Sequence, residues 1–246
     1  MRISRLYINQ ALKAEAEIVL TKDAAHYLVN VLRLRVGAEL VLFNGEGGEY
    51  TARLIVVDKK HAKLQLLEYH DIERESSLDL TLVQAISRPE HMNYTIQKAV
   101  ELGVTRIVPL ISKRSPPIDK NKIHKREQQW QKIIISACEQ SGRNSLPILD
   151  QVQTLTTYLA DKTQLENCIV LAPKANNSVS KLDIDKKITV LIGAEGGLTD
   201  EEIQYAIEAG YLDVGLGSRI LRTETAAIAM LSLCQGFWGD FTYHGL

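Results

Sequence analysis

The sequence has few cysteines and no long apolar run. Its three cysteines, Cys138, Cys168 and Cys234, lie far apart and form no Cys-x-x-Cys pair of the kind found in zinc or redox sites. We therefore expect reduced core thiols and no metal. The longest stretch without a charged residue, 225–239, is shorter than the ~20 residues of a membrane span. Because the first residues also lack the apolar segment of a secretory signal, the sequence predicts a soluble, cytoplasmic protein.

An excess of charge of either sign is also absent. Lysine and arginine total 29, against 30 aspartates and glutamates, which gives a formal net charge of −1. Net charge alone therefore indicates neither a nucleic-acid nor a membrane partner, and any basic surface has to be local. With 246 residues, of which 45% are hydrophobic, the chain can form one large or two modest packed domains, and wholesale disorder is excluded.

The pattern of the chain changes near residue 72. Before it, short β-rich runs predict a small barrel, with one helix that Thr21 caps. The expected strands cover residues 5–8, 17–20, 39–43, 50–57 and 62–69. After a polar, aperiodic stretch, strand and helix patterns alternate, which predicts a parallel α/β sheet. The expected domains are residues 1–72 and 73–246.

The second domain is expected to alternate between buried strands and helices. The strands are expected at residues 78–86, 106–110, 168–172, 188–192 and 212–216, and the helices at 92–102, 122–141, 200–209 and 225–237. The last helix is apolar nearly all round and must be buried, and Thr223 or Thr225 is expected to cap it. Ligands of open α/β sheets bind beyond the carboxyl ends of strands, so the loops there are the candidate site.

Glycine-rich loops follow the last two expected strands. The first, residues 193–199, reads Gly-Ala-Glu-Gly-Gly-Leu-Thr, which is not the Gly-x-Gly-x-x-Gly fingerprint. Glu195 and the acidic start of the next helix disfavour a phosphate and favour a ligand that carries positive charge. The second loop, within residues 215–227, holds Arg222 and Glu224 beside two glycines. The residues alone leave open a simple tight turn in the first loop and an ordinary surface ion pair in the second.

Four segments of the second domain form a recognisable series. They are residues 96–104, Ile-Gln-Lys-Ala-Val-Glu-Leu-Gly-Val; 137–144, Ala-Cys-Glu-Gln-Ser-Gly-Arg-Asn; 192–197; and 216–226. In this order and spacing they resemble the SPOUT-class methyltransferases, specifically the small-subunit ribosomal RNA uridine-N3 methyltransferases of RsmE type. Residues 26–37 resemble the N-terminal PUA-like barrel of that family. The resemblance therefore covers the whole chain.

The resemblance implies methylation of a uridine N3 in small-subunit (16S) ribosomal RNA, with S-adenosylmethionine as cofactor. It further implies a SPOUT-type domain with a deep trefoil knot that holds the cofactor. The partners implied are the ribosomal RNA or assembled small subunit and, through the C-terminal domain, a second copy of the chain in a homodimer. The residues expected around the cofactor are Leu171, Ala172, Gly193, Glu195, Gly196, Leu216, Gly217, Ile220 and Leu221.

Two positions depart from the family pattern. Ala194 stands where the family has proline, which frees one backbone angle in the loop and should affect its rigidity more than its chemistry. His91 stands where the family has a second basic residue. A histidine is mostly neutral at pH 7, so its contribution to RNA contact is reduced. A single histidine at a helix start is also more often structural than a general base.

Transfer of a methyl group to uracil N3 requires an in-line approach and loss of the N3 proton. We expect Arg222 to stabilise negative charge on the uracil oxygens, and Glu224 to orient Arg222 or to accept the proton, with water as the alternative acceptor.

Residues 113–143 form a locally basic segment, with eight lysines and arginines against three acids. Phosphate contacts are expected from Arg5, Arg33, Arg35, Arg114, Lys120, Lys122 and Arg143. A solvated helix face remains the alternative for the lysines.

Two other classes of protein remain as alternatives. In the first, the barrel binds RNA and the second domain is only a dimerising platform without catalysis. The second is a nucleotide-dependent α/β enzyme, which is disfavoured because the chain has neither a Walker lysine after a glycine loop nor the dinucleotide fingerprint.

Overall fold

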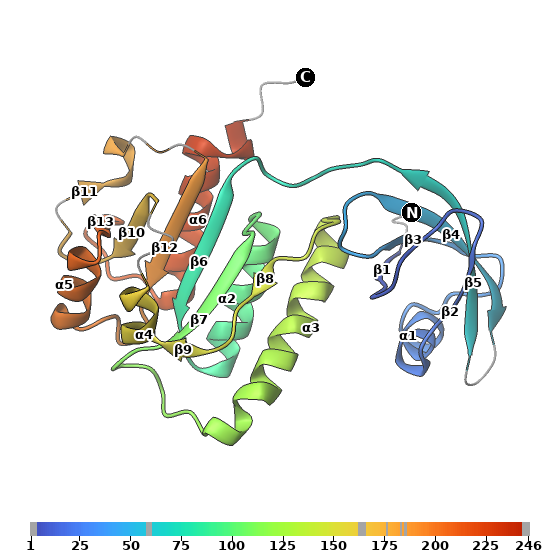
Figure 1. The fold of residues 1–246 in the computed structure, drawn as a ribbon, viewed down its shortest axis with the longest axis horizontal. Helices are drawn as coiled ribbons and strands as arrows, with labels where there is room; N and C mark the ends of the chain where they lie inside the picture. The colour runs from blue at the N-terminus through green and yellow to red at the C-terminus, as the bar shows by residue number, and fades with distance from the viewer. Residues whose placement is uncertain are drawn as a thin grey trace. The chain divides into compact units, whose positions relative to one another are not determined.

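The computed structural model describes residues 4–57, 61–161, 166–175, 177–182, 184 and 186–242. The chain divides into two compact units, which Figure 1 shows with their helices and strands. The first unit consists of Met1–Glu75 and Cys138–Leu146, and the second of Ser76–Ala137 and Pro147–Leu246. Residues 138–146 thus belong to the first unit, although the expected domain limits place them in the second.

The first unit contains a five-stranded sheet. Its strands are β1 (Arg5–Tyr7), β2 (Glu17–Val19), β3 (Glu39–Phe43), β4 (Glu49–Val57) and β5 (Ala62–His70), in the order β1-β3-β4-β5-β2. β1 and β3 are parallel, and the other neighbours are antiparallel. Each strand lies within one residue of its predicted limits, because alternating apolar residues and turn-forming residues mark these strands clearly.

A short helix packs on this sheet. The helix α1 (Lys22–His26) continues into one π-helical turn, Tyr27–Val31, and the Thr21 hydroxyl accepts a hydrogen bond from the Ala24 N–H, which confirms the predicted cap. Leu28 of this turn is fully buried. It belongs to one apolar core with strand residues that include Leu40, Leu42, Leu54, Leu64 and Leu66.

Buried ion pairs hold residues 138–146 in the first unit. Arg143 is only 5% exposed and forms an ion pair with Glu75, and Arg5 pairs with Glu49. Arg5 also donates a 2.6 Å hydrogen bond to Oδ1 of Asn144. A buried guanidinium has to be paired, because its uncompensated desolvation is costly. Phosphate contact by Arg5 or Arg143 would therefore require these pairs to break.

The second unit is built on a parallel sheet, as the alternating pattern predicts. Its order is β11-β13-β10-β12-β6-β7-β8, with β9 also paired to β7, and all these pairings are parallel. The strands are β6 (Asp79–Ala85), β7 (Arg106–Ile111), β8 (Ile148–Leu149), β9 (Gln153–Thr154), β10 (Cys168–Leu171), β11 (Asn177–Ser178), β12 (Lys187–Ile192) and β13 (Leu212–Gly215). The sequence prediction missed β8, β9 and β11, because a strand of two residues has no periodicity.

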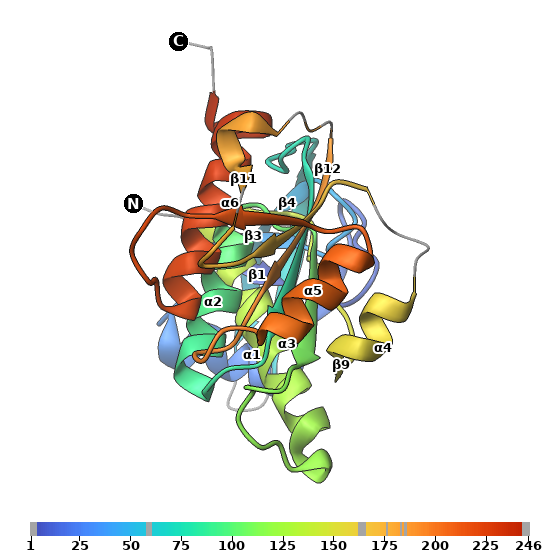
Figure 2. The same cartoon turned by 90° about the vertical axis from the view of Figure 1, so that its left-hand side faces the viewer.

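Helices cover both faces of this sheet. They are α2 (Pro89–Glu101), α3 (Ile123–Ser141), α4 (Leu155–Ala160), α5 (Asp200–Glu208) and α6 (Thr223–Trp238). Figure 2 shows α2 and α6 on one side of the sheet and α4 and α5 on the other. Because both faces are covered, the central strands are buried almost throughout, as in β12. The four predicted helices are all present, and the short α4 was not predicted.

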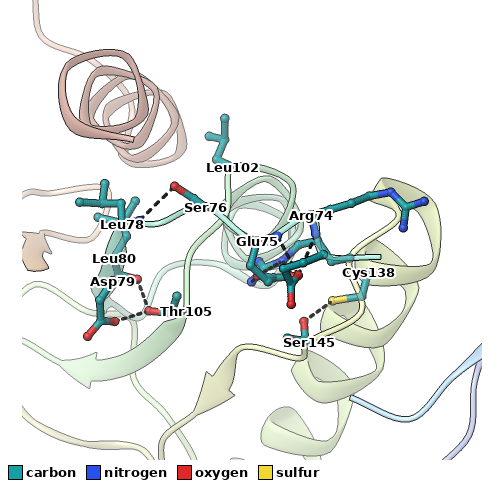
Figure 3. A network of polar contacts seen from close by, with 12 residues as sticks. Arg74, Glu75, Ser76, Leu78, Asp79, Leu80, Leu102, Thr105, Cys138 and Ser145 are labelled. Carbon is teal, nitrogen blue, oxygen red and sulfur yellow. Dashed lines mark hydrogen bonds and ion pairs between the residues drawn. The ribbon is translucent and has the colours of Figure 1, made fainter. Parts of the chain in front are cut away.

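Polar contacts fix the starts and ends of several elements (Figure 3). The Thr105 hydroxyl donates to Oδ1 of Asp79 at 2.6 Å, and so ties the start of β6 to the residue before β7.

Cys138 is buried, and its Sγ donates a hydrogen bond to the carbonyl oxygen of Ser145. Burial raises the pKa of Cys138 and of Cys234 to about 12, so both thiols stay protonated at neutral pH. The prediction of reduced core thiols is confirmed, because all three cysteines are free and buried.

The last helix, α6, is buried along one face. Ala227, Met230, Leu231 and Cys234 are fully buried at helical spacing, while several of its other apolar side chains are half-buried. Phe237 in its last turn and Phe241 just after it are 51% and 56% exposed. Within the described residues, no helix combines the length and the apolar character that crossing a membrane requires.

Candidate active site

Three neighbouring strands end at one edge of the second unit's sheet. β13, β10 and β12 are adjacent and parallel, so the loops after Leu171, Ile192 and Gly215 leave from the same edge. A cavity of about 280 Å³ lies there, close to the lower end of the ~300–1,000 Å³ range of small-molecule sites. This is the place where open α/β sheets bind their ligands.

The cavity brings together all nine residues that the sequence predicts around the cofactor. They are Leu171, Ala172, Gly193, Glu195, Gly196, Leu216, Gly217, Ile220 and Leu221. Other lining residues extend the wall, namely Arg114, Pro173, Ile192, Ala194, Gly197, Leu198, Val214, Arg219, Thr223 and Ala226. Sequence reasoning missed Arg114 and Thr223 as cavity residues, because their place depends on how separate loops pack.

The first glycine-rich loop, residues 193–198, folds tightly on itself. A Cβ on Gly193 would lie 2.5 Å from the carbonyl carbon of Gly197 and 2.7 Å from the nitrogen of Leu198, and both of these atoms are backbone. Gly197 has a φ of +70°, a conformation that side chains other than glycine rarely adopt. Ala194, which departs from the family's proline, is buried and forms a bridge with Gly197. Glycine at position 193 is therefore a steric requirement.

A buried hydrogen-bond network ties this loop to the sheet and to α6. Thr223 donates from Oγ1 to the carbonyl oxygen of Gly193 at 2.6 Å. Gln84, fully buried at the end of β6, donates from Nε2 to the same carbonyl at 3.2 Å and to Thr223 Oγ1 at 3.0 Å. The predicted capping by Thr223 or Thr225 is wrong. Arg222 occupies the N-cap position of α6 without a side-chain cap, and Thr223 contacts the cavity loop.

Arg114 holds the same loop from another direction. Its Nη1 donates to the carbonyl oxygens of Gly196 at 2.7 Å and Leu198 at 3.1 Å. The neighbouring Lys113 donates its backbone N–H to Oε1 of Glu202 at 2.7 Å. Glu202 also completes a capping box at the start of α5. The segment after β7 is thus fixed to the loop that borders the cavity.

Glu195 connects the loop to the start of α2. Its Oε1 accepts a 2.7 Å hydrogen bond from the backbone N–H of Arg88, the N-cap residue of that helix. A carboxylate is favourable at a helix N-terminus, where unpaired N–H groups carry partial positive charge. Glu195 therefore stabilises the start of α2 in addition to lining the cavity.

The expected catalytic pair is arranged differently from the sequence prediction. Oε1 of Glu224 lies 3.2 Å from Nδ1 of His91, and Oε2 is buried with no hydrogen-bond partner in the described part of the chain. Arg222 is exposed and, within the described residues, forms no ion pair with Glu224. Both residues lie at the start of α6 beside Thr223, which lines the cavity. The partner of Glu224 is thus His91, a contact between α2 and α6.

The second loop, residues 216–221, is exposed where it borders the cavity. Ile220 is 92% exposed, and Arg219 is exposed as well. Gly217 has a φ of +87°, and a Cβ there would meet nothing within 4 Å. Over the described residues, no group of histidine, cysteine and carboxylate side chains has the arrangement of a metal site.

The other residues expected to contact RNA are exposed where the structure describes their side chains, and one of them lies near a carboxylate. Arg33, Arg35 and Lys122 are exposed, and Lys122 lies 3.7 Å from a carboxylate oxygen of Asp119. The side chain of Lys120 lies outside the described part of the chain. Exposed cations of this kind remain available to a phosphate backbone.

Comparison with known proteins agrees with this fold. Residues 74–235 match the model of an RNA methyltransferase domain, and residues 20–67 match that of an RNA methyltransferase PUA domain. The chain is thus an RNA methyltransferase by class. It is 34% identical to the ribosomal RNA small subunit methyltransferase E of Buchnera aphidicola (subspecies Schizaphis graminum), over 98% of this chain and 99% of that protein. The chain belongs to the ribosomal RNA small subunit methyltransferase E family.

Two solved structures are similar to this chain over nearly its whole length. A Legionella pneumophila methyltransferase in complex with S-adenosylmethionine is 38% identical, with a TM-score of 0.94 over 98% of this chain and all of that chain. The ribosomal RNA small subunit methyltransferase E of Neisseria gonorrhoeae, also bound to S-adenosylmethionine, is 38% identical, with a TM-score of 0.91 and the same coverage.

Proposed function

We propose that this protein uses S-adenosylmethionine to methylate N3 of a uridine in small-subunit (16S) ribosomal RNA. The observation that carries the proposal is the cavity at the ends of β10, β12 and β13, which all nine expected cofactor residues line. Family membership supports the reaction class, and two relatives of high similarity bind this cofactor in their solved structures.

The lining of the cavity fits S-adenosylmethionine. One wall is apolar, with Leu171, Ala172, Val214, Leu216 and Leu221, and suits the flat adenine ring. Four glycines also line the cavity, Gly193, Gly196, Gly197 and Gly217, and glycine lets backbone approach a ligand closely. Charged groups of both signs, Glu195, Arg114 and Arg219, also line the cavity. A ligand that carries ammonium, sulfonium and carboxylate groups needs such a mixture.

The chemistry divides between the cofactor and the protein. When bound, S-adenosylmethionine supplies an electrophilic methyl group and leaves as S-adenosylhomocysteine. Arg222 stabilises the negative charge that develops on the uracil oxygens when N3 loses its proton. Glu224, whose Oε2 has no partner in the described structure, accepts that proton, and His91 holds the carboxylate in place through Oε1.

The RNA contacts proposed are electrostatic. Arg33, Arg35 and Lys122 are exposed and would neutralise phosphates, and Lys120 is retained from the sequence prediction. The buried ion pairs of Arg5 and Arg143 support a structural role for these two residues. The target uridine has to leave the RNA stack to enter the site.

The remaining parts of the proposal concern assembly. We propose that the second unit contains the trefoil knot implied by the resemblance and forms a homodimer. The half-buried apolar side chains of α6 and the exposed Ile220 support an interface there. A ribosomal RNA substrate also supports a cytoplasmic location. Light scattering that finds a stable, fully active monomer would contradict the dimer.

Product analysis tests the reaction directly. The purified protein is incubated with methyl-labelled S-adenosylmethionine and either small ribosomal subunits or their RNA, and the RNA is digested to nucleosides. Label in 3-methyluridine is the expected result. Label in another nucleoside would overturn the assigned atom, and no binding of the cofactor would favour a non-catalytic RNA-binding protein.

Replacement of Arg222 tests its role. R222A should lower kcat/KM by roughly 100-fold or more, because one lost transition-state contact costs this much in other enzymes. Cofactor affinity should stay unchanged, since Arg222 does not line the cavity. The control is R53A, an exposed arginine of β4 that pairs with Glu39 and does not line the cavity. Unchanged turnover in R222A would refute the assignment.

A further inference from the structure

The charged side chains that line the cavity differ in how firmly the protein holds them. Among the described residues that line it, three are charged: Arg114, Arg219 and Glu195. Oε1 of Glu195 is already occupied by the N–H of Arg88. Arg219, on the loop that contains Ile220, and Arg114 are both exposed, but of the two, within the described residues, only Arg114 has side-chain hydrogen bonds. Arg114 is therefore the cation of the cavity that other parts of the protein hold in position.

The contacts of Arg114 orient its guanidinium group. Nη1 donates to the carbonyl oxygens of Gly196 and Leu198, at 2.7 and 3.1 Å. A guanidinium has five N–H groups in a rigid plane, and two on one nitrogen fix the direction of the other three. Within the described structure, no contact involves Nε or Nη2 of Arg114. These N–H groups remain available to a ligand.

The stem of Arg114 is also held in place. A Cβ on Gly196 would lie 3.2 Å from Cδ and 3.3 Å from Cβ of Arg114, so the arginine lies directly on this glycine. The preceding residue, Lys113, is tied to Glu202 by its N–H, and Ser112 donates its N–H to Oγ of Ser115 at 3.1 Å. A cation held in this way loses little side-chain entropy when it binds an anion.

Arg114 lies where the carboxylate end of S-adenosylmethionine would reach. The apolar residues of the cavity come from the ends of β10 and β13 and the loops after them, whereas Arg114, from the segment after β7, contacts the loop after β12. An adenine ring among the apolar residues would leave the amino-acid end of the cofactor facing the 193–198 loop and Arg114. That end carries a carboxylate, and arginine N–H groups match the two oxygens of a carboxylate.

We propose that Arg114 binds the carboxylate of S-adenosylmethionine with its Nε and Nη2 edge, while Nη1 holds the cavity loop. This inference rests on the proposed use of S-adenosylmethionine. It gives Arg114 a binding role towards the cofactor in place of the expected RNA contact. It also makes the cavity selective for adenosyl ligands that retain a free carboxylate.

The test is a calorimetric comparison of two ligands, S-adenosylmethionine and its decarboxylated form, with the full-length protein. The wild-type protein should bind the decarboxylated ligand roughly 10- to 100-fold more weakly, as expected for the loss of charge-assisted hydrogen bonds. R114Q should bind S-adenosylmethionine more weakly by a similar factor. R114Q also loses the Nη1 contacts to the loop, which affects both ligands alike. Its preference for S-adenosylmethionine over the decarboxylated ligand should therefore fall by roughly 10-fold or more relative to the wild type.

The matched control is R126Q, which removes the same charge from an arginine of α3 that does not line the cavity. R126Q should keep the wild-type affinity for both ligands. A similar loss of both ligands in R114Q would overturn the proposal and leave Arg114 as a support of the loop only. Unchanged binding of S-adenosylmethionine in R114Q would also overturn it.

The wild-type protein alone provides a further check if R114Q does not fold. Equal wild-type affinity for the two ligands would overturn the carboxylate contact without any variant. A wild-type protein that binds neither ligand would instead contradict the proposed cofactor. The two failures are therefore distinguishable.

Discussion

Two glycine-rich loops border the cavity, and they differ in how the protein holds them. The loop of residues 193–198 receives hydrogen bonds from Gln84, Thr223 and Arg114, which lie in three other segments of the chain. The loop of residues 216–221 is exposed at Arg219 and Ile220. The two loops look alike in sequence, yet the structure fixes the first far more strongly than the second.

The two loops should therefore contribute differently to ligand binding, one as a wall formed before binding and the other as a segment that binding orders. A loop that is fixed before binding costs little conformational entropy when the ligand arrives, and it determines where the ligand lies. A loop with few contacts has low local stability and is ordered by whatever covers it, whether a ligand or a second copy of the chain. The first loop should therefore be sensitive to substitution, and the second tolerant.

The largest effect is expected from G193A. Its Cβ would lie 2.5 Å from backbone, so the loop has to move. We expect a loss of about 1–3 kcal/mol in the free energy of unfolding, as for other overpacked sites. Because the moved loop forms the cavity wall, S-adenosylmethionine affinity should fall by roughly 100-fold. Urea unfolding and calorimetry measure the two quantities.

The matched variant in the second loop is G217A. A Cβ there meets nothing within 4 Å, and only the φ of +87° opposes it. The expected cost is about 1 kcal/mol, from left-handed strain alone. If G217A weakened cofactor binding as much as G193A, the distinction between the two loops would be lost.

The next largest effect is expected from T223V, which keeps the shape of the side chain but removes Oγ1. Gln84 Nε2 and the Gly193 carbonyl oxygen then each lose a buried partner. The free energy of unfolding should fall by about 1–3 kcal/mol in urea titrations. T225V is the control, because Thr225 is exposed on the same helix and should change stability by less than ~0.5 kcal/mol. Equal effects of the two substitutions would contradict the network.

A smaller effect is expected from E195A. The substitution removes the hydrogen bond to the N–H of Arg88 at the start of α2. The loss should be about 1 kcal/mol, typical of a helix N-cap. E195Q keeps an oxygen that can accept this hydrogen bond, so it should lose only part of that stability. A stability of E195Q as low as that of E195A would mean that the charge, and not the hydrogen bond, is what Glu195 contributes.

The smallest effect is expected from I220S in the second loop. Because Ile220 is 92% exposed, the free energy of unfolding should change by less than ~0.5 kcal/mol, measured at low protein concentration. A loss above about 1 kcal/mol would show that this loop is packed in solution. It would then no longer differ from the first loop.

Much of the fold could be predicted from local patterns. The strands of the first unit agree with the expected limits within one residue, and Thr21 caps its helix as expected. These features depend on side-chain alternation and on capping chemistry, which act over a few residues. The two-residue strands β8, β9 and β11 could not be predicted, because only pairing with a neighbour defines them.

Side-chain partners were harder to predict than elements. Glu224 pairs with His91 on α2, although Arg222 lies two residues away in the sequence. Arg5 and Arg143 are buried in ion pairs, although isolated arginines in a sequence look like surface cations. In each case the partner comes from a distant segment, and a single sequence gives no signal for that proximity.

The sequence by itself determined the class of fold, the parallel sheet and the two loops beyond the strand ends as the candidate site, and the family resemblance added nine of the residues that line the cavity. The loops could be recognised because ligands bind beyond the ends of parallel strands and because the glycine-rich loops lie at those ends. Only the tertiary structure decided which loop is rigid, that Thr223 and Gln84 hold Gly193, and that Arg114 lines the cavity with one edge unpaired in the described structure. These properties arise from contacts between residues far apart in the chain, and such contacts exist only once the chain has packed.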